Sequence, residues 1–407
     1  MMGGPSSAVR RRLSPLSPVS LPHRQSALYF ASFVATGMVL AALGPALPGL
    51  ARQTGVEINA ISILFVTQNL GVLMGTIASG RRFDRWPAHP FMAAMMAIMA
   101  ITVALAPLPG SLIVLAVVLF TFGLGKGGID VASNTALVWV QGAGVGPYMN
   151  ALHFFFGLGA LISPTLVAVV LDRTGSVAGA YWLMALAIAP LPFLFLRTPS
   201  PAPPPAVAGV AARQVPWAPV VMTATLFFLY VGVEIGYSGL VFSYATRLGL
   251  AVTVSAGYLT SLFWACITLG RLLTIPLAAR VRPRFLLWVD LSGILVFLTL
   301  LAVWPQTPVV VWIVTIGLGF SMASFYPTLI SLAGRHLPLT GRVAAWFMVG
   351  GGLGAMIVPW LLGQRFSAQG PQVLAPTLLF LAVLAVVVLA GLLALFRRME
   401  SVDTLAR

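Results

Sequence analysis

The chain consists almost entirely of long apolar runs whose length matches the thickness of a lipid bilayer. Hydrophobic residues make up 59% of its 407 residues, whereas charged residues make up only 8%. About 20 consecutive apolar residues cross the hydrocarbon core as a helix. Because a soluble surface carries roughly 25–35% charged residues, a soluble protein of this composition could not cover itself. The sequence therefore predicts an all-α integral membrane protein, with the lipid bilayer as its first partner.

Twelve transmembrane helices are predicted from these runs. The single cysteine, Cys266, lies in the eighth, so an intramolecular disulfide is excluded and the redox compartment cannot be inferred from cysteine usage. The predicted spans cover residues 25–50, 58–80, 89–107, 110–140, 146–172, 177–197, 216–247, 253–279, 284–304, 307–334, 340–364 and 373–397.

The net charge of +15 is explained by membrane topology. Seventeen arginines fall in the two tails and in alternate loops, and only Arg52, Arg173, Arg247 and Arg365 fall in the opposite loops. The positive-inside rule then places both termini in the cytoplasm. The expected location is the plasma (cytoplasmic) membrane. No nucleic-acid partner is predicted, because the basic residues follow the loops rather than forming one patch.

A proline-rich segment divides the chain into two halves. Residues 198–215, which contain the run PSPAPPPA, are predicted to be an extended cytoplasmic linker between a bundle at 25–197 and a bundle at 216–397. Residues 1–24 carry Arg, Ser and Pro without an apolar core, which favours a disordered tail over a cleaved targeting peptide. Residues 398–407 form a second cytoplasmic tail.

Short fragments repeat across the two halves in the same order. Their offsets of 194 to 199 residues are nearly constant, which indicates a duplicated six-helix unit. Two such repeats with a site between them near the bilayer midplane are typical of transporters. The matching fragments are Leu70-Gly71 with Leu269-Gly270, Gly123–Gly125 with Gly317–Gly319, and Gly157–Pro164 with Gly352–Pro359.

Two charges lie inside the fourth span. Lys126, the only lysine, precedes Asp130 by four residues, so the two side chains share one helix face with Asn134. A charge at the bilayer centre costs about 2.5–3.5 kcal/mol on insertion scales, and such groups usually face a bundle interior or a water-filled path. Asp130 is therefore a candidate proton or cation site, and the alternative is a structural ion pair with Lys126.

The loop after the second span resembles a signature of the major facilitator superfamily. Residues 80–90 read GRRFDRWPAHP, and Gly80, Asp84 and Arg85 fit the pattern G-x-x-x-D-R-x-G-R-K. Pro87, Ala88 and His89 replace its last part. The resemblance implies a cytoplasmic gating role for the three matching residues; the alternative is a tight loop whose charges only set topology.

Longer fragments resemble one branch of that superfamily, the animal sodium-dependent glucose transporter-like proteins and the allied bacterial fucose permeases. The resemblance implies a two-bundle carrier that moves a sugar or similar small polar solute, with a monosaccharide favoured, by alternating access coupled to H⁺ or Na⁺. It also implies that Asp130 takes the place of a coupling acid. No cofactor is implied, and a monomer is expected. The fragments are Leu43–Leu50, Gly127–Gly142, Ala151–Pro164, Phe227–Ala245 and Gly257–Ala278.

Further polar and aromatic residues inside spans are candidates for the solute path. Glu234, midway along the seventh span, is a second ion or hydroxyl contact, unless it is only hydrogen-bonded within its bundle. Arg271 and Asp290 enter the membrane from the same side and can form a gating pair, unless Arg271 extends to the cytoplasm. The candidates for substrate binding are Gln68, Asn69, Asn134, His153, Tyr237, Trp264, Tyr326 and Trp346.

Three other functions are weighed against a coupled sugar carrier. Lys126 could replace a coupling cation beside Asp130, which would make the protein an uncoupled uniporter. The 24 Phe and 15 Met are compatible with a proton-coupled exporter of amphipathic compounds. An intramembrane enzyme is disfavoured, because the four histidines are scattered and no metal-ligand spacing is present.

Overall fold

The structure is a computed structural model that describes residues 21–80, 86–202, 216–278, 280–337 and 341–405. All regular secondary structure in these residues is helical. The elements are α1 (Leu21–Thr54), α2 (Ile58–Ile61), α3 (Ile63–Gly80), α4 (Ala88–Leu105), α5 (Leu112–Gln141), η2 (Gly142–Gly144), α6 (Val145–Thr174), α7 (Ala178–Ile188), α8 (Pro190–Arg197), α9 (Trp217–Arg247), α10 (Thr253–Ala278), α11 (Pro283–Val303), α12 (Pro308–Met322), α13 (Phe325–His336), α14 (Gly341–Gln369), η3 (Pro371–Val373) and α15 (Leu374–Leu405).

Twelve apolar segments in these residues are long enough to cross a membrane, which confirms the predicted number. Several ends differ from the prediction. α1 begins at Leu21, so residues 21–24 are helical rather than part of a disordered tail. Pro22 fits there because the first turn of a helix needs no donated backbone hydrogen bond, and Gln25 anchors the turn by donating to the Pro199 carbonyl at 2.8 Å. α15 likewise continues to Leu405, beyond the predicted end at 397.

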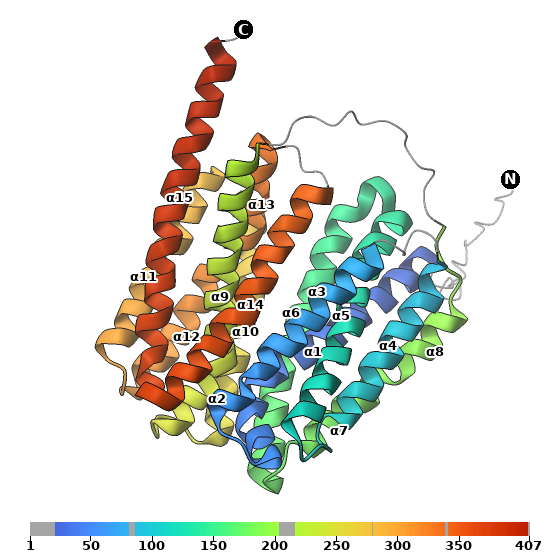
Figure 1. Ribbon diagram of the computed structural model, residues 1–407. Helices are drawn as coiled ribbons and strands as arrows, with labels where there is room; N and C mark the ends of the chain where they lie inside the picture. The colour runs from blue at the N-terminus through green and yellow to red at the C-terminus, as the bar shows by residue number, and fades with distance from the viewer. Residues whose placement is uncertain (1–20, 81–85, 203–215, 279, 338–340, 406–407) are drawn as a thin grey trace, which may run out of the picture.

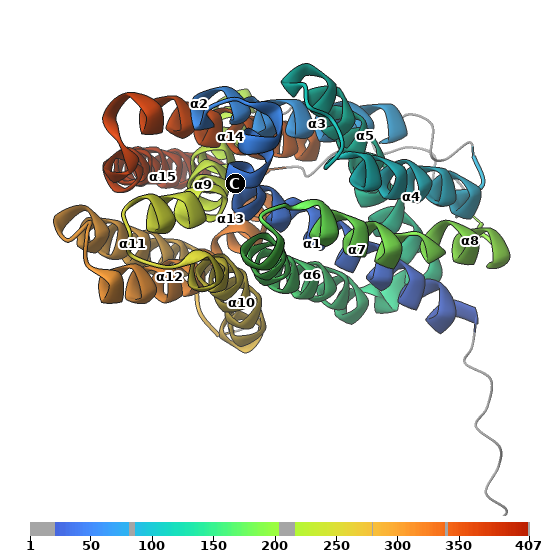
Figure 2. The same ribbon diagram turned by 90° about the horizontal axis from the view of Figure 1, so that it is seen from below.

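The helices of each half pack mainly against one another, as Figure 2 shows for the blue-to-green and yellow-to-red groups. Equivalent glycines of the repeat bring equivalent helices together. A Cβ on Gly159 of α6 would lie 2.0 Å from the Val34 carbonyl oxygen of α1, and one on Gly354 of α14 would lie 2.2 Å from the Phe228 carbonyl oxygen of α9. Small residues of this kind permit close helix approach in membranes, so the duplicated fragments share a packing role.

Contacts between the two halves gather away from the chain termini. We call the end that carries the starts of α1 and α9 and the end of α15 the terminal end (Figure 1). Gly44 of α1 touches Gly239 of α9 closely enough that a Cβ on Gly44 would lie 2.7 Å from the Gly239 carbonyl oxygen. The Thr165 and Ser261 hydroxyls join α6 to α10 at 2.8 Å.

A third seam joins α2 and α3 to α14. Gln364 of α14 donates to the Asn59 carbonyl of α2 at 2.7 Å, and Ser62, between α2 and α3, donates to the Trp360 carbonyl at 3.4 Å. Together with the α1–α9 and α6–α10 contacts, this seam lies between mid-helix and the end opposite the termini. The structure is therefore a conformation whose two halves are closed on each other at that end.

A disulfide across the α6–α10 seam tests this conformation. In a Cys266→Ser background, Thr165→Cys with Ser261→Cys is expected to cross-link on oxidation, because the two side chains already meet and disulfide geometry needs Cβ atoms about 3.5–4.5 Å apart. Gel mobility after cleavage in the 203–215 region measures the cross-link. Uptake is expected to stop and to return with reductant, and either single cysteine is the control. Full transport by the cross-linked protein would show that this seam need not open.

Candidate functional site

The fourth span, α5, presents its two charges toward the middle of the molecule. Lys126 Nζ lies 2.6 Å from Asp130 Oδ2, which confirms that the two side chains meet. Glycines fix the helix orientation: a Cβ on Gly127 would lie 2.2 Å from the Val72 carbonyl oxygen of α3, and Gly128 packs on Met95 of α4. Two faces of α5 are thereby occupied by neighbouring helices, which leaves the charged face for the interior.

A second ion pair lies in the other half. Arg271 of α10 approaches Glu234 of α9 with 3.9 Å between guanidinium nitrogen and carboxylate oxygen. The two pairs are built alike. Lys126 and Glu234 are 9% exposed in their side chains, whereas their partners Asp130 and Arg271 are 24% and 29% exposed. Each half thus contributes one deeply buried charge and one opposite charge that faces a more open space.

His153 and Tyr326 lie within electrostatic range of charges from both ion pairs. His153 on α6 is exposed although it lies inside a span, and it is subject to the charges of both Asp130 and Arg271. Tyr326 on α13 is subject to Glu234, Arg271 and Asp130. We call this group the central polar cluster; its members are Lys126, Asp130, His153, Glu234, Arg271 and Tyr326.

Aromatic rings border the cluster. Lys126 Nζ lies 6.0 Å from the centre of the Phe156 ring. The Phe156 ring meets Trp264 of the other half edge to face at 6.2 Å, and His153 stands edge to face on Phe33 at 5.7 Å. These rings present flat apolar surfaces beside charged groups, the combination that binds the faces of sugar rings.

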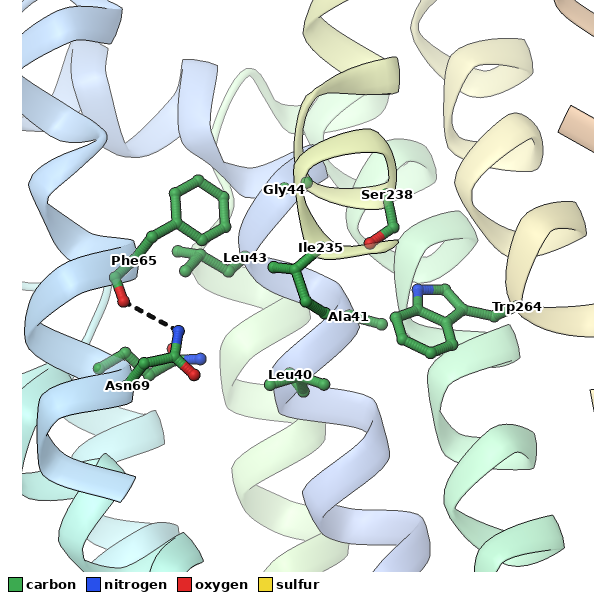
Figure 3. Close-up of a pocket in the computed structure, with 11 residues that line it drawn as sticks. Leu40, Ala41, Leu43, Gly44, Phe65, Asn69, Ile235, Ser238 and Trp264 are labelled. Atoms are coloured by element: carbon green, nitrogen blue, oxygen red, sulfur yellow. Dashed lines mark hydrogen bonds between the residues drawn. The ribbon is translucent and has the colours of Figure 1, made fainter. Parts of the chain in front are cut away.

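A small pocket lies between the halves on the closed side of the cluster (Figure 3). Gln68 and Asn69 of α3, Ser238 of α9 and Trp264 of α10 contribute its polar groups. The free space of about 10 Å³ suits about one water molecule and cannot hold a monosaccharide. The Trp264 indole nitrogen is buried without a hydrogen-bond partner in the described structure. This N–H group can therefore donate to a ligand or a water molecule.

Asn69 was predicted to line an open solute path, but in this conformation its side chain lies between the two halves. Its amide donates to Phe65 of its own helix at 2.9 Å and to the Ala355 carbonyl of α14 at 3.4 Å. In this conformation Asn69 therefore helps to hold the two halves together.

Several predicted site residues lie outside the cluster. Tyr237 is fully buried in the second half, where its hydroxyl meets Thr315 at 2.7 Å. Trp346 is 48% exposed and packs edge to face on Trp217. Asn134 donates to the Asp130 carbonyl of its own helix at 2.7 Å. Tyr237 and Asn134 are thus hydrogen-bonded within their own halves, and the Trp346 ring packs within the second half; their roles in solute binding stay predictions.

The expected gating groups are also placed differently. Arg271 pairs with Glu234, whereas Asp290 is buried and accepts the Ser324 hydroxyl at 2.6 Å. An Arg271–Asp290 gate is therefore not formed in this conformation. Gly80 ends α3 at the terminal end and is exposed, and Asp84 and Arg85 lie outside the described residues.

The interrupted tenth span was missed by the sequence prediction. The helix stops after Met322 and starts again at Phe325, where Pro327 lacks the N–H that would reach the Ala323 carbonyl. The Tyr230 hydroxyl donates to the Met322 carbonyl at 2.7 Å. Non-helical backbone at membrane depth is tolerated only where protein or a cavity surrounds it. Pro327 was the available signal, but prolines also lie inside the unbroken helices α1 and α14.

Two six-helix halves around a shared charged interior define a polytopic membrane transporter. The sequence profile of the Major Facilitator Superfamily matches residues 28–359, and the chain belongs to that superfamily. The superfamily consists of transporters, so the intramembrane-enzyme hypothesis is wrong.

Curated relatives cover most of the chain. It is 28% identical to the sodium-dependent glucose transporter 1A of Mus musculus, over 82% of this chain and 88% of that one. It is 27% identical to the major facilitator superfamily domain-containing protein 4A of Homo sapiens, over 90% and 89%. These relatives agree with the branch that the sequence fragments indicated.

Solved structures with low identity share the fold. The nucleoside transporter NupG superposes with a TM-score of 0.70 at 17% identity, covering 93% of this chain and 99% of that one. A D-xylose-proton symporter superposes with a TM-score of 0.71 at 13% identity, covering 90% and 97%. At these identities the likeness establishes the fold, and the solute must be argued from the site.

Removing the hydroxyl that caps the helix break tests its structural weight. Tyr230→Phe leaves the buried Met322 carbonyl without its partner, which is expected to cost about 1–3 kcal/mol. The expected result is a lower thermal unfolding midpoint of the purified protein. Tyr258→Phe is the matched control, because Tyr258 is 46% exposed on α10. An unchanged midpoint for Tyr230→Phe would show that the hydrogen bond does not stabilise the break.

Proposed function

We propose that this protein is a proton-coupled secondary transporter of a monosaccharide, with Asp130 as the coupling residue. The observation that carries the proposal is the 2.6 Å ion pair between Lys126 and Asp130 at the core of a two-half transporter. The relatives named sodium-dependent glucose transporters support the sugar class. The positive-inside count supports termini in the cytoplasm, and we propose the cytoplasmic membrane as the location.

The ion pair favours H⁺ over Na⁺ as the coupling ion. The Lys126 ammonium already occupies the position beside Asp130 that a metal cation would take. A proton, in contrast, can neutralise the carboxylate directly, since Asp130 is the more exposed partner of the pair. Protonation of Asp130 would release Lys126 and remove the attraction that holds the pair. The two protonation states of Asp130 then favour different arrangements of the central polar cluster, which is what coupling requires.

The second pair and the aromatic border supply a solute site. Glu234 and Arg271 offer acceptors and donors for sugar hydroxyls, and at 3.9 Å the two charged groups are too far apart to be hydrogen-bonded to each other. His153 and Tyr326 face the same charges from neighbouring helices. Trp264 and Phe156 supply ring surfaces. In this proposal the sugar touches groups from both halves, so its binding is coupled to their relative position.

The closed seam assigns a direction to this conformation. The contacts of α1 with α9, of α2 and α3 with α14 and of α6 with α10 seal the end opposite the termini, and the central polar cluster lies on the terminal side of that seal. With the termini in the cytoplasm, this is an inward-facing state. In the opposite state the seam opens, which would expose Gln68, Asn69 and Trp264 to a solute arriving from outside.

An uncoupled uniporter is the alternative that the same ion pair favours. If Asp130 never takes up a proton, Lys126 neutralises it permanently and no ion moves with the solute. Uptake of labelled glucose and fucose into proteoliposomes separates these cases. Accumulation under a H⁺ gradient is expected. Accumulation only under a Na⁺ gradient would overturn the choice of ion, equilibration without accumulation would establish the uniporter, and no uptake would favour another solute or export of amphipathic compounds.

Neutralising the coupling acid is expected to uncouple transport. Asp130→Asn should abolish H⁺-driven accumulation, because the amide takes up no proton, while exchange at equal concentrations persists. Asp172→Asn, at an exposed position on α6, is the matched control and should accumulate sugar like the parent chain. Accumulation by Asp130→Asn at the parent level would remove Asp130 from the coupling mechanism.

Removing the ammonium tests the choice between a proton and a metal ion. Lys126→Ala leaves Asp130 without its counter-charge, so we expect altered ion dependence, with Na⁺ gaining the ability to stimulate uptake. The measurement is initial uptake rate at fixed pH with and without Na⁺. Ion dependence identical to that of the parent chain would return Lys126 to a structural role.

A further inference from the structure

A second, larger cavity lies far from the central polar cluster, at the terminal end of the second half. Its volume is about 340 Å³, within the range of about 300–1,000 Å³ that is usual for ligand pockets. Three helices meet around it: α11 at its first residues, α13 at its last residues and α15 near its end. Because three transmembrane spans begin or end here, the cavity lies at the level of the membrane–water boundary.

The cavity is cationic at its mouth and aromatic in its wall. Arg282, Arg284 and Arg397 line it, together with the ring of His336, and no carboxylate is among its described lining residues. The His336 ring is stacked on Phe396 with centroids 4.1 Å apart, which fixes one wall. Arginines on two separate helices that converge on one space are arranged to bind an anion from two sides.

The apolar part of the lining opens toward the lipid-facing side. Phe285 is 60% exposed and Trp288 is 36% exposed, and both line the cavity. Val289 and Val296, four and eleven residues after Phe285, are 51% and 62% exposed. Because these intervals return to nearly the same helix face, the four side chains form a largely apolar track, with the small Ser292 between Val289 and Val296, that runs from the cavity along α11 into the membrane. A soluble anion would make no use of this track, whereas an acyl chain would lie along it.

We propose that this cavity binds the phosphate-bearing headgroup of an anionic phospholipid. The phosphate lies between Arg284 and Arg397, Trp288 takes the interfacial position typical of its side chain, and an acyl chain follows the track on α11. Basic pockets between transmembrane helices on the cytoplasmic side bind anionic headgroups in this way. The distribution of arginines predicts that this end of the protein is cytoplasmic. This prediction agrees with the lipid proposal, because the cytoplasmic leaflet carries the anionic lipids.

Lipid-dependent thermal stability tests the site without reference to transport. The full chain in neutral detergent is titrated with phosphatidylglycerol or phosphatidylcholine while its unfolding midpoint is measured. Phosphatidylglycerol is expected to raise the unfolding midpoint at a concentration at least about tenfold lower than phosphatidylcholine requires, because its phosphate contacts two guanidinium groups. Arg284→Gln with Arg397→Gln should abolish this preference. Arg280→Gln with Arg335→Gln, which removes the same charge at the same end from exposed positions outside the cavity, should keep it.

Further measurements distinguish a lipid from a soluble anion and keep the test valid if a variant fails to fold. Inorganic phosphate or glycerol phosphate should not reproduce the stabilisation; if either does, the site binds a soluble anion and the lipid proposal is wrong. Equal effects of the two lipids, or a preference retained by the cavity variant, would also overturn it. Brominated phosphatidylglycerol is expected to quench the fluorescence of Trp288 in the parent chain. The Trp288→Phe variant should therefore show less quenching than the parent chain. Unchanged quenching would contradict lipid binding even if the arginine variant fails to fold.

Discussion

The structure depends on how charge is held inside a low-dielectric interior. An unpaired ion is costly there, so each half supplies its own opposite charge: Lys126 for Asp130 and Arg271 for Glu234. Each ion pair is electrically neutral by itself and needs no charge from the other half. The two halves can therefore separate or rotate without leaving either ion pair with a net buried charge. A moving interface of this kind requires that the charges of each half be balanced within that half.

The closed seam is held by weaker forces, as a reversible contact should be. It consists of close glycine packing between α1 and α9, one hydroxyl pair between α6 and α10, and amide-to-carbonyl hydrogen bonds that join α2 and α3 to α14. Interhelical hydrogen bonds in membranes contribute about 0.6 kcal/mol on average. No ion pair of the described residues crosses the seam. A few such contacts can be exchanged for water when the seam opens, whereas a buried salt bridge would resist opening.

The number of spans, the repeat and the Lys126–Asp130 contact could be predicted from the sequence because each follows from local spacing. Apolar run length counts the spans, and four residues along a helix place two side chains on one face. The pairing of Arg271 with Glu234 rather than Asp290 could not be predicted, because it depends on how α9, α10 and α11 rotate against one another. Tyr237 and Trp346 show the same difficulty, since a polar or aromatic side chain inside a span can face its own bundle equally well.

The break between α12 and α13 shows why a proline pattern alone does not locate such a feature. Pro45, Pro164 and Pro359 lie inside helices that remain continuous, whereas Pro327 follows an interruption. The difference lies in the partners: Tyr230 takes the Met322 carbonyl and Asp290 takes the Ser324 hydroxyl, so the broken backbone and the residue beside it are bonded from two helices. Tyr230 stands one helical turn before Glu234 on α9. The break is thus hydrogen-bonded to α9, the helix that carries Glu234 of the central polar cluster. A shift of α9 would therefore displace the midpoint of the tenth span.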